Sequence, residues 1–267
     1  MRLLDGKSLA EFIKARQIRE LKKLERTKGL KPLLAIVTTG NNPVSDTYID
    51  LKRKYAADIG VETSLHKCEQ PQATPLIKKL GKDSTVTGII VQLPLDDPTE
   101  TNDICRLIPP AKDIDGLNPD STYDSATATA IDWLLAGYGI NLKDKKIAIL
   151  GKGKLVGGPL MKLWHGAGLD VTGMDEDNLS MATVATADII VTATGTPGLL
   201  TINDIKDGAV VVDAGTTSTG GGLVGDVDPD VYGFKKSLTI TPRKGGVGPM
   251  TIAVLFERLL VAAKLNT

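Results

Sequence analysis

Apolar and polar positions alternate along the first half of the chain in segments that predict strands and helices in turn. Short apolar runs typical of buried strands are separated by stretches in which apolar residues recur at helical spacing. The predicted strands are residues 33–39, 61–68 and 87–93, and the predicted helices are residues 1–29, 43–60 and 74–81. Because parallel neighbours need crossover connections, this order predicts a parallel sheet in an N-terminal α/β domain.

The second half of the chain repeats this alternation after a helix that is expected over residues 125–137. A strand at residues 145–150 is followed by a glycine-rich turn, a helix, and further strands at residues 187–195 and 208–215. This order is typical of a Rossmann-like dinucleotide-binding domain. The closing residues 251–265 have helical spacing, and we expect that helix to pack back on the first domain.

The predicted fold class is therefore α/β, with two domains and a cleft between them. Residues 1–122 together with residues 248–267 are expected to form the N-terminal domain, and residues 123–247 are expected to form the Rossmann-like domain.

Charge and composition narrow the class of partner. The chain has 32 acidic and 32 basic side chains, so its zero net charge favours neither nucleic acid nor an anionic membrane surface. No apolar stretch is long enough to span a bilayer. Two cysteines, Cys68 and Cys105, and two separated histidines, His66 and His165, indicate neither a disulfide framework nor a familiar metal cluster. We therefore expect a cytoplasmic protein with a small-molecule partner and no metal.

Four polar residues, Tyr48, Lys52, Gln92 and Asp115, form a candidate active site. Tyr48 and Lys52 are four positions apart, which places them on one helical face, and Gln92 stands where an apolar strand ends. Open α/β sheets bind their ligands at such strand ends. Each residue also has a structural interpretation. Lys52 lies in a charge run typical of a solvated helix face, Asp115 precedes a turn-forming glycine, Tyr48 fits an ordinary half-buried aromatic, and Gln92 fits a strand-end polar residue.

A second candidate site is the turn that contains Gly151, Gly153 and Gly157. It gives G-x-G-x-x-x-G between a predicted strand and a predicted helix, one residue longer than the usual dinucleotide fingerprint. Glycines let the backbone approach a pyrophosphate, whose charge is then held at a helix N-terminus. The alternative is a plain strand-to-helix turn. Glycines at residues 195–198 and 215, also at strand ends, favour nucleotide binding.

Five motifs in this order resemble one known family. They are Tyr48-x-x-x-Lys52, VQLPL at residues 91–95, KDIDG at residues 112–116, GKGKLVGGP at residues 151–159 and TPRKGGVGPMT at residues 241–251. Together they cover most of the chain and are similar to the bifunctional methylenetetrahydrofolate dehydrogenase/methenyltetrahydrofolate cyclohydrolase family. The resemblance implies a homodimer formed through the Rossmann-like domain.

The resemblance implies two successive reactions of one folate. A hydride passes from 5,10-methylenetetrahydrofolate to a nicotinamide, and water then opens the methenyl cation to 10-formyltetrahydrofolate. One alternative is a cyclohydrolase whose dehydrogenase activity is weak or absent. Another is a non-enzymatic nucleotide-binding regulator, which the set of four polar residues argues against.

The resemblance also implies a role for each matched residue. Lys52 would polarise or deprotonate the group that attacks the cation, while Tyr48 would stack on the folate and hydrogen-bond Lys52. Gln92 would orient Lys52 or the water, and Asp115 would accept bonds from the pterin. The implied substrate-binding residues are Tyr48, Gln92, Leu93, Pro94, Asp115, Gly246 and Pro249, and the implied cofactor-binding residues are Gly151, Lys152, Gly153, Val156, Gly157, Asp175, Thr194, Gly195 and Thr127.

Departures from the family pattern bear on the cofactor. Three acids at residues 175–177 replace the family's usual phosphate-friendly segment after the second strand of the Rossmann-like domain. A carboxylate there, such as Asp175, suits the ribose 2′-hydroxyl of NAD and repels the 2′-phosphate of NADP. We therefore expect NAD, although NADP is commoner in the family and Lys152 and Lys154 can reach a 2′-phosphate.

Two further departures lie near the predicted domain boundaries. The stretch between Gly116 and the predicted helix is shorter than in the family, and of residues 125–130 only Thr127 keeps the family's residue type. The resemblance implies that this loop helps to shape the crevice near the nicotinamide, so the family pattern supports the folate site more strongly than the geometry of hydride transfer. Arg243 and Lys244 replace the family's usual Val-Pro. These two cations can either attract a polyglutamate tail or be solvated.

Overall fold

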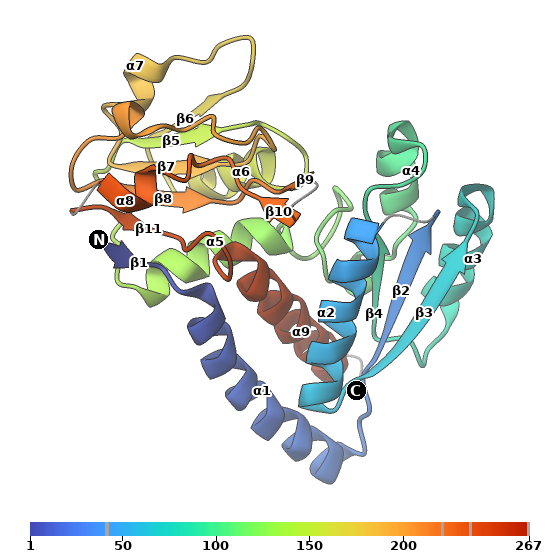
Figure 1. Cartoon of the computed structure of the whole chain (residues 1–267). Coiled ribbons are helices and arrows are strands. Elements are labelled where there is room, and N and C mark those ends of the chain that lie inside the picture. The colour runs from blue at the N-terminus through green and yellow to red at the C-terminus, as the bar shows by residue number, and fades with distance from the viewer. Residues whose placement is uncertain (41–42, 220–221, 235–236, 266–267) are drawn as a thin grey trace. The chain divides into compact units, whose positions relative to one another are not determined.

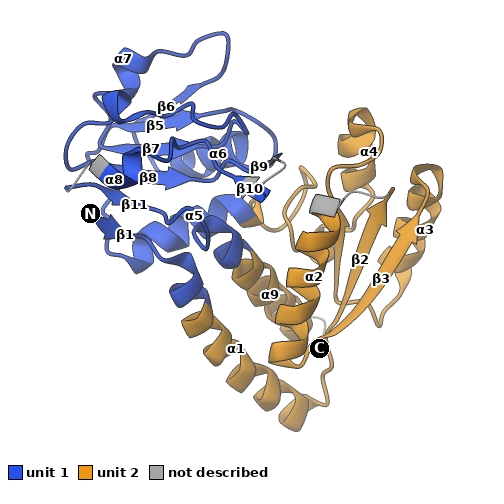
Figure 2. Cartoon of the chain, in the orientation of Figure 1, with its two compact units in different colours: residues 1–10, 127–251 blue, residues 11–126, 252–267 orange. Residues whose placement is uncertain are grey.

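The computed structural model describes residues 1–40, 43–219, 222–234 and 237–265, and the chain forms two compact units (Figures 1 and 2). Unit 1 consists of residues 1–10 and 127–251, and unit 2 consists of residues 11–126 and 252–267. Each unit has a parallel sheet of its own. The predicted class, α/β with two units, is confirmed.

The division of the chain differs from the expected one at three places. Residues 1–10 fall in unit 1 because β1 (Arg2–Leu3) pairs in parallel with β11 (Thr239–Ile240). A strand of two residues is too short to show a hydrophobic period, so the sequence did not predict it. The chain also passes between units after residue 126 and after residue 251, each four residues beyond the expected boundary.

Unit 2 has a three-stranded parallel sheet in the order β3-β2-β4. Its strands are β2 (Leu33–Thr39), β3 (Glu62–Cys68) and β4 (Gly88–Gln92). Its helices are α2 (Pro43–Ile59), α3 (Gln70–Lys82), α4 (Thr101–Arg106) and parts of two others, α1 (Gly6–Lys28) from residue 11 onward and α9 (Val247–Leu265) from residue 252 onward. Helix α3 begins four residues before the helix expected over residues 74–81. Pro71 fits its first turn, where a missing N–H costs nothing.

Alternate residues of these strands face two helical layers (Figure 1). On one face, Ala35, Val37, Ile89 and Val91 pack with apolar residues of α3 and α4. On the other face lie α2 and α9, whose aromatic residues Tyr55 and Phe256 stack with ring centroids 5.1 Å apart. A side chain at Gly88 would come within 2.7 Å of Leu259, so glycine there permits close packing of α9. The face covered by α2 and α9 also holds Gln92.

Unit 1 has a six-stranded parallel sheet in the order β1-β11-β8-β7-β5-β6. Its remaining strands are β5 (Ile147–Leu150), β6 (Val171–Met174), β7 (Ile189–Thr192), β8 (Val210–Asp213) and the antiparallel pair β9 (Thr217–Thr219) and β10 (Gly222–Val224), and its helices are α5 (Ala126–Gly137, of which residue 126 falls in unit 2), α6 (Gly157–Gly166), α7 (Met181–Val184) and α8 (Val231–Phe234). The connection after β5 leads to β6 on one side of β5, and the connection after β6 leads to β7 on the other side of β5. This is a topological switch point, where doubly wound sheets bind nucleotides.

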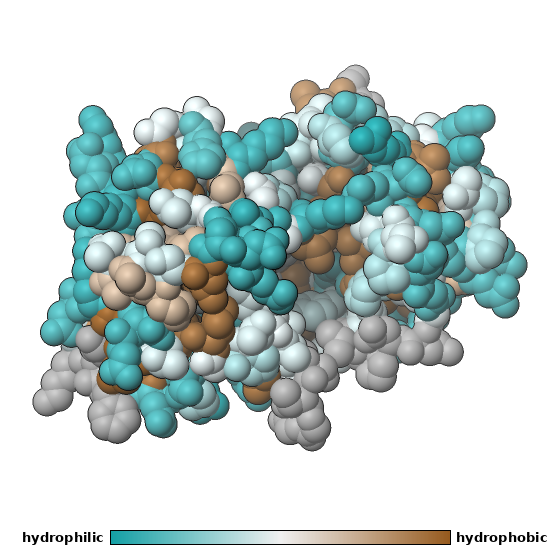
Figure 3. Space-filling view, turned by 90° about the horizontal axis from the view of Figure 1, so that it is seen from above, coloured by the Kyte–Doolittle hydropathy of each residue, from teal (hydrophilic) through white to brown (hydrophobic). Residues whose placement is uncertain are grey.

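Polar residues cover much of the surface visible in Figure 3, and apolar residues form separate patches on it. Some large apolar side chains are highly exposed, among them Phe12, which is 73% exposed, and Leu265, which is 77% exposed. In the described part of the chain, no helix is both long enough and apolar enough to cross a membrane.

Candidate functional site

Lys52 and Gln92 form a buried pair in unit 2. The Nζ atom of Lys52 on α2 donates a hydrogen bond of 2.7 Å to Oε1 of Gln92 at the end of β4, and the two residues are only 8% and 7% exposed. The Nε2 atom of Gln92 donates to the Leu93 carbonyl at 2.8 Å, which fixes the orientation of the amide. The charge run alone would suggest that Lys52 lies on a solvated helix face, but its side chain is buried.

The surroundings of Lys52 shift the titration of its amine. Burial disfavours the charged ammonium and lowers the pKa of Lys52, while the negative charge of Asp115 raises it to a lesser extent. The net direction is downward, which increases the fraction of neutral amine near neutral pH. A neutral amine with a fixed hydrogen-bond partner is suited to take up a proton.

Asp115 lies on a loop that a neighbouring carboxylate organises. The fully buried Asp113 accepts hydrogen bonds from the backbone N–H groups of Gly116 and Asn118 at 3.1 and 2.8 Å, and it forms a parallel bridge with Ile89 of β4. The carboxylate that shapes this turn therefore belongs to Asp113. Asp115 itself is half-buried. This placement disfavours the structural interpretation of Asp115 as the turn former.

Arg258 on α9 is a further cation near Asp115. It is 7% exposed, it donates to the Ile114 carbonyl at 3.0 Å, and its guanidinium lies 5.2 Å from the ring centroid of Tyr123. Burial raises the pKa of Asp115, whereas the positive charges of Lys52 and Arg258 lower it. Burial is the larger effect, so the pKa of Asp115 is raised, and the two cations limit that rise.

Tyr48 lies one helical turn before Lys52 on α2 and is half-buried. The hydrogen bond expected between Tyr48 and Lys52 is absent among the described residues, and Gln92 is the residue that holds the amine. Of the other implied substrate-binding residues, Leu93 is half-buried, and it precedes Pro94 through a cis peptide bond. Gly246 and Pro249 belong to unit 1, and their part in the folate site stays a prediction.

In unit 1, four neighbouring strands end at the same level. Met174, Leu150, Thr192 and Asp213 are register partners across β6, β5, β7 and β8. The segments that follow these residues contain most of the implied cofactor-binding residues, and they emerge side by side at the carboxyl edge of the sheet. This is the edge at which Rossmann-like sheets bind dinucleotides.

The glycine turn has the close packing that phosphate binding requires. Gly151 has a φ of +90°, and a side chain at Gly157 would come within 1.7 Å of the Gly151 carbonyl oxygen. By contrast, a side chain at Gly153 would meet open space. The N-cap of α6, Val156, makes no side-chain capping hydrogen bond. The residues present therefore fit a pyrophosphate at the start of α6.

Asp175 directly follows β6, and its Oδ2 atom forms an ion pair with Nζ of Lys152 at 2.6 Å. The hydrogen bond from Lys152 holds the pKa of Asp175 below its usual value. A backbone hydrogen bond of 2.7 Å from Gly151 N–H to the Met174 carbonyl joins the two segments. Asp175 is thus at the edge expected for a ribose-binding carboxylate, and its charge is already paired.

Thr194 and Gly195 follow β7. The N–H and the hydroxyl of Thr194 both donate to Oδ2 of Asp226, at 2.7 and 2.9 Å. Asp226 accepts both of these hydrogen bonds, so a bound dinucleotide would contact the backbone of the turn and would not receive a hydrogen bond from these two donors. Thr127, in the first turn of α5, is half-buried.

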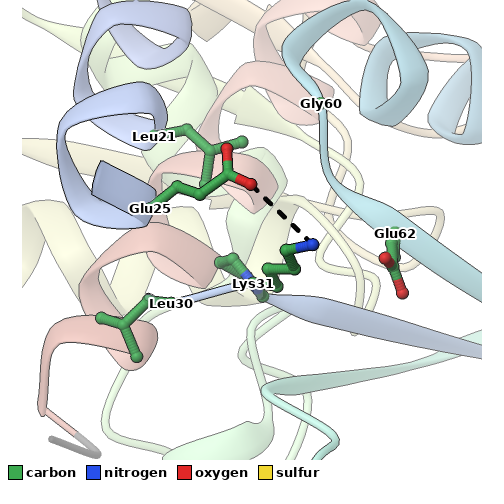
Figure 4. Close-up of a pocket in the computed structure, with 7 residues that line it drawn as sticks. Leu21, Glu25, Leu30, Lys31, Gly60 and Glu62 are labelled. Carbon is green, nitrogen blue, oxygen red and sulfur yellow. Dashed lines mark ion pairs between the residues drawn. The ribbon is translucent and has the colours of Figure 1, made fainter. Parts of the chain in front are cut away.

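The structure also contains a pocket that none of the predicted residues line (Figure 4). Its lining includes Lys31 and Glu62, just before β2 and at the start of β3, and Glu25, which is 3.9 Å from Lys31. These residues lie at the amino ends of the strands, whereas Gln92 lies at a carboxyl end. The pocket is therefore distinct from the candidate site.

Comparison with known proteins decides the family. Residues 4–115 match the model for the tetrahydrofolate dehydrogenase/cyclohydrolase catalytic domain, and residues 125–267 match the model for the NAD(P)-binding domain of the same family. The chain belongs to the tetrahydrofolate dehydrogenase/cyclohydrolase family. The expectation drawn from the five motifs is confirmed.

Individual members of this family match the chain over its whole length. The bifunctional protein FolD of Aliarcobacter butzleri is 37% identical, and the match covers 100% of this chain and 98% of the relative. The crystal structure of the bifunctional FolD dehydrogenase/cyclohydrolase from Campylobacter jejuni is 34% identical with a TM-score of 0.93, covering 100% of both chains. The Trypanosoma brucei enzyme, solved with NADP and an inhibitor, is 32% identical with a TM-score of 0.91 and covers 98% of this chain and 97% of its own.

Sequence reasoning missed three residues at the two candidate sites of this family member. Arg258 is a single arginine in a strongly apolar helical segment, a pattern that can indicate a buried and paired cation. Asp113 lies two positions before Asp115, and the sequence alone does not show which of these two carboxylates forms the turn. Asp226 had no local signal, because its partner Thr194 is 32 positions away.

Proposed function

We propose that the protein oxidises 5,10-methylenetetrahydrofolate with a nicotinamide dinucleotide and then hydrolyses the methenyl product to 10-formyltetrahydrofolate. The observation that carries the proposal is the buried Lys52–Gln92 pair, with Asp115 close enough to affect the pKa of Lys52. All three residues lie within residues 4–115, which match the family's catalytic-domain model. The names of the similar FolD proteins support the same pair of activities.

Lys52 is the proposed base for ring opening. Its neutral amine takes a proton from the attacking water as the water oxygen bonds to the carbon between N5 and N10. The hydroxyl group of this adduct then loses its remaining proton as the C=O bond forms, the bond from carbon to N5 breaks, and N5 takes up a proton. The formyl group is left on N10, and one proton, the one first taken by Lys52, is released overall. Gln92 accepts a hydrogen bond from Nζ and so keeps the amine in one position without adding a charge.

Asp115 is the proposed anchor for the pterin. An ionised carboxylate has two acceptor oxygens, which match neighbouring N–H donors of the pterin ring. Burial raises the pKa of Asp115, and the charges of Lys52 and Arg258 oppose that rise in part. Leu93, Pro94 and Tyr48 are proposed to contact the remainder of the folate.

The carboxyl edge of the unit 1 sheet is the proposed dinucleotide site. Gly151, Gly153 and Gly157 let the backbone approach the pyrophosphate, and α6 presents its N-terminus to that charge. Gly195 belongs to the neighbouring turn. When bound, the nicotinamide supplies the hydride acceptor for the oxidation.

We propose NAD as the preferred dinucleotide. The support is the place of Asp175 at the end of β6, where a carboxylate suits the ribose 2′-hydroxyl. The ion pair with Lys152 weakens the repulsion of a 2′-phosphate, so we expect a moderate preference rather than exclusion of NADP. The Trypanosoma brucei relative was solved with NADP. A homodimer and a cytoplasmic location stay predictions.

The test is absorbance-monitored turnover of 5,10-methylenetetrahydrofolate with NAD and, separately, with NADP, followed by decay of added methenyltetrahydrofolate. Reduction of NAD together with rapid decay supports the proposal. A preference for NADP would contradict the role of Asp175 but not the two reactions. Decay without reduction of either dinucleotide would leave a cyclohydrolase alone.

A further inference from the structure

Two carboxylates, the buried Asp226 and the half-buried Asp213, lie at the strand ends of unit 1. The proposed chemistry assigns no role to either. Asp213 is the last residue of β8, and Asp226 comes two positions after β10. Asp226 is 0% exposed, and its Oδ1 atom has no hydrogen-bond partner among the described residues. A buried carboxylate oxygen without a partner costs stability, so the requirements of folding alone do not explain this residue.

Asp226 determines the shape of the turn after β7. Its Oδ2 atom accepts hydrogen bonds from both the N–H and the hydroxyl of Thr194, and the Thr194 hydroxyl in turn accepts from the N–H of Thr196 at 3.1 Å. Two hydrogen bonds to the carboxylate and a third between the two threonines therefore hold the turn. Gly195, with a φ of +70°, lies between the two threonines.

Asp213 in turn holds Asp226. The Oδ1 atom of Asp213 accepts from the Asp226 N–H at 3.1 Å, and its Oδ2 atom accepts from the Val227 N–H at 3.1 Å. Glycines permit this arrangement on both sides. A side chain at Gly215 would come within 2.1 Å of the Asp226 carboxylate, and one at Gly225 would come within 2.0 Å of the Asp213 carboxylate. The ends of β7 and β8 and the segment after β10 are thus joined through two carboxylates.

We propose that Asp226 is a positioning residue for the dehydrogenase reaction, which holds the turn at residues 194–198 in the shape that receives the dinucleotide. Asp213 keeps Asp226 in place. This inference rests on the proposed binding of the dinucleotide at Gly151, Gly153 and Gly195. It assigns no role to Asp226 in ring opening, because the Lys52–Gln92 pair lies in unit 2.

The chain offers a matched control in the same unit. Oδ2 of Asp204 accepts from the N–H and the hydroxyl of Thr201, at 2.9 and 2.6 Å, which is the same pair of hydrogen bonds that Asp226 makes with Thr194. Thr201 and Asp204 form the capping box of a short 3-10 helix at residues 202–204, which follows the turn at residues 194–198 in the chain. Asp204→Leu therefore removes equivalent bonds without altering the turn.

The experiment compares Asp226→Leu, Asp226→Asn and Asp204→Leu in the full chain, with the dinucleotide Kd measured by calorimetry alongside both activities. Asp226→Leu should raise the Kd about tenfold or more, as expected for the loss of two charge-assisted hydrogen bonds. The rate of ring opening should stay within about twofold of the wild-type rate, a change that corresponds to less than about 0.5 kcal/mol. Asp226→Asn keeps an acceptor oxygen and should largely restore binding, and Asp204→Leu should leave the Kd unchanged.

An unchanged Kd in Asp226→Leu would overturn the inference. An equal loss of ring opening would also overturn it, because that result indicates a general structural role. If Asp226→Leu does not fold, Thr194→Val decides, since it removes only the hydroxyl bonds. A raised Kd then supports the inference and an unchanged one overturns it.

Gly153→Val separates this inference from the dinucleotide site on which it rests. Its side chain meets open space in the protein but would obstruct the proposed pyrophosphate position. If Gly153→Val weakens binding and Asp226→Leu does not, only the role of Asp226 is wrong. If neither variant weakens binding, the proposed site is wrong as well.

Discussion

The two candidate sites use different physical means. In unit 2, buried side chains carry the chemistry, and their charges shift one another's pKa, as Lys52 and Asp115 do. In unit 1, the backbone carries the binding, through strands that end in register and a turn in which Gly157 packs on Gly151. A side-chain site should therefore be sensitive to changes of chemistry, and a backbone site should be sensitive to changes of volume.

The largest expected effect is on the side-chain site. Lys52→Met should reduce the hydrolysis of methenyltetrahydrofolate by about 10²–10⁴-fold, the usual contribution of a positioned proton-transfer group. The chain should still fold, because methionine fills a similar volume without a buried charge. Decay of methenyl absorbance measures the rate, with the exposed Lys54→Met on the same helix as the control.

Near wild-type hydrolysis in Lys52→Met would show that the buried amine is not the base. The contrast between the two units would then lose its main support.

The backbone site should respond most to added volume. Gly157→Ala places a methyl group where only 1.7 Å separates it from the Gly151 carbonyl oxygen, so we expect a loss of about 3 kcal/mol in the free energy of unfolding. Gly153→Ala adds the same group in open space and should change stability little. Urea denaturation of the two variants makes the comparison. Equal stability would mean that the glycine turn is not closely packed.

Removing Arg258 should change the pH dependence of the side-chain site. Its charge lowers the pKa of Asp115, so Arg258→Met should raise that pKa and protonate the carboxylate at higher pH. If Asp115 acts ionised, the acid limb of the kcat/KM profile then moves to higher pH. Arg16→Met removes an exposed arginine that pairs with Glu257 at 2.6 Å, and it should leave the profile in place. A shift to lower pH in Arg258→Met would contradict this account of Asp115.

The smallest expected effect concerns the choice of dinucleotide. Asp175→Asn removes the carboxylate and frees Lys152 from its ion pair, so the preference should move toward NADP. An exposed pair of this kind is worth up to roughly 1 kcal/mol, so we expect a change of about two- to fivefold in the ratio of kcat/KM values. Asp177→Asn, an exposed acid in the same segment, is the control. A move toward NAD would refute the assigned role.

The sequence by itself determined the α/β class, the two parallel sheets and the family, because alternating strand and helix periods and short motifs are local features. It placed Lys52 and Gln92 among the candidates, although Lys52 alone looked like part of a solvated charge run. Only the tertiary structure decided that the amine is buried and held by Gln92, 40 positions away, rather than by Tyr48.

Other features depended entirely on contacts distant in sequence. The pairing of β1 with β11, the approach of Arg258 to the Asp115 loop and the bonds from Thr194 to Asp226 each join segments separated by 32 or more positions. No local pattern encodes such contacts, because they form when whole elements pack. Burial, which sets the direction of the Lys52 and Asp115 pKa shifts, likewise belongs to the folded chain and not to its sequence read locally.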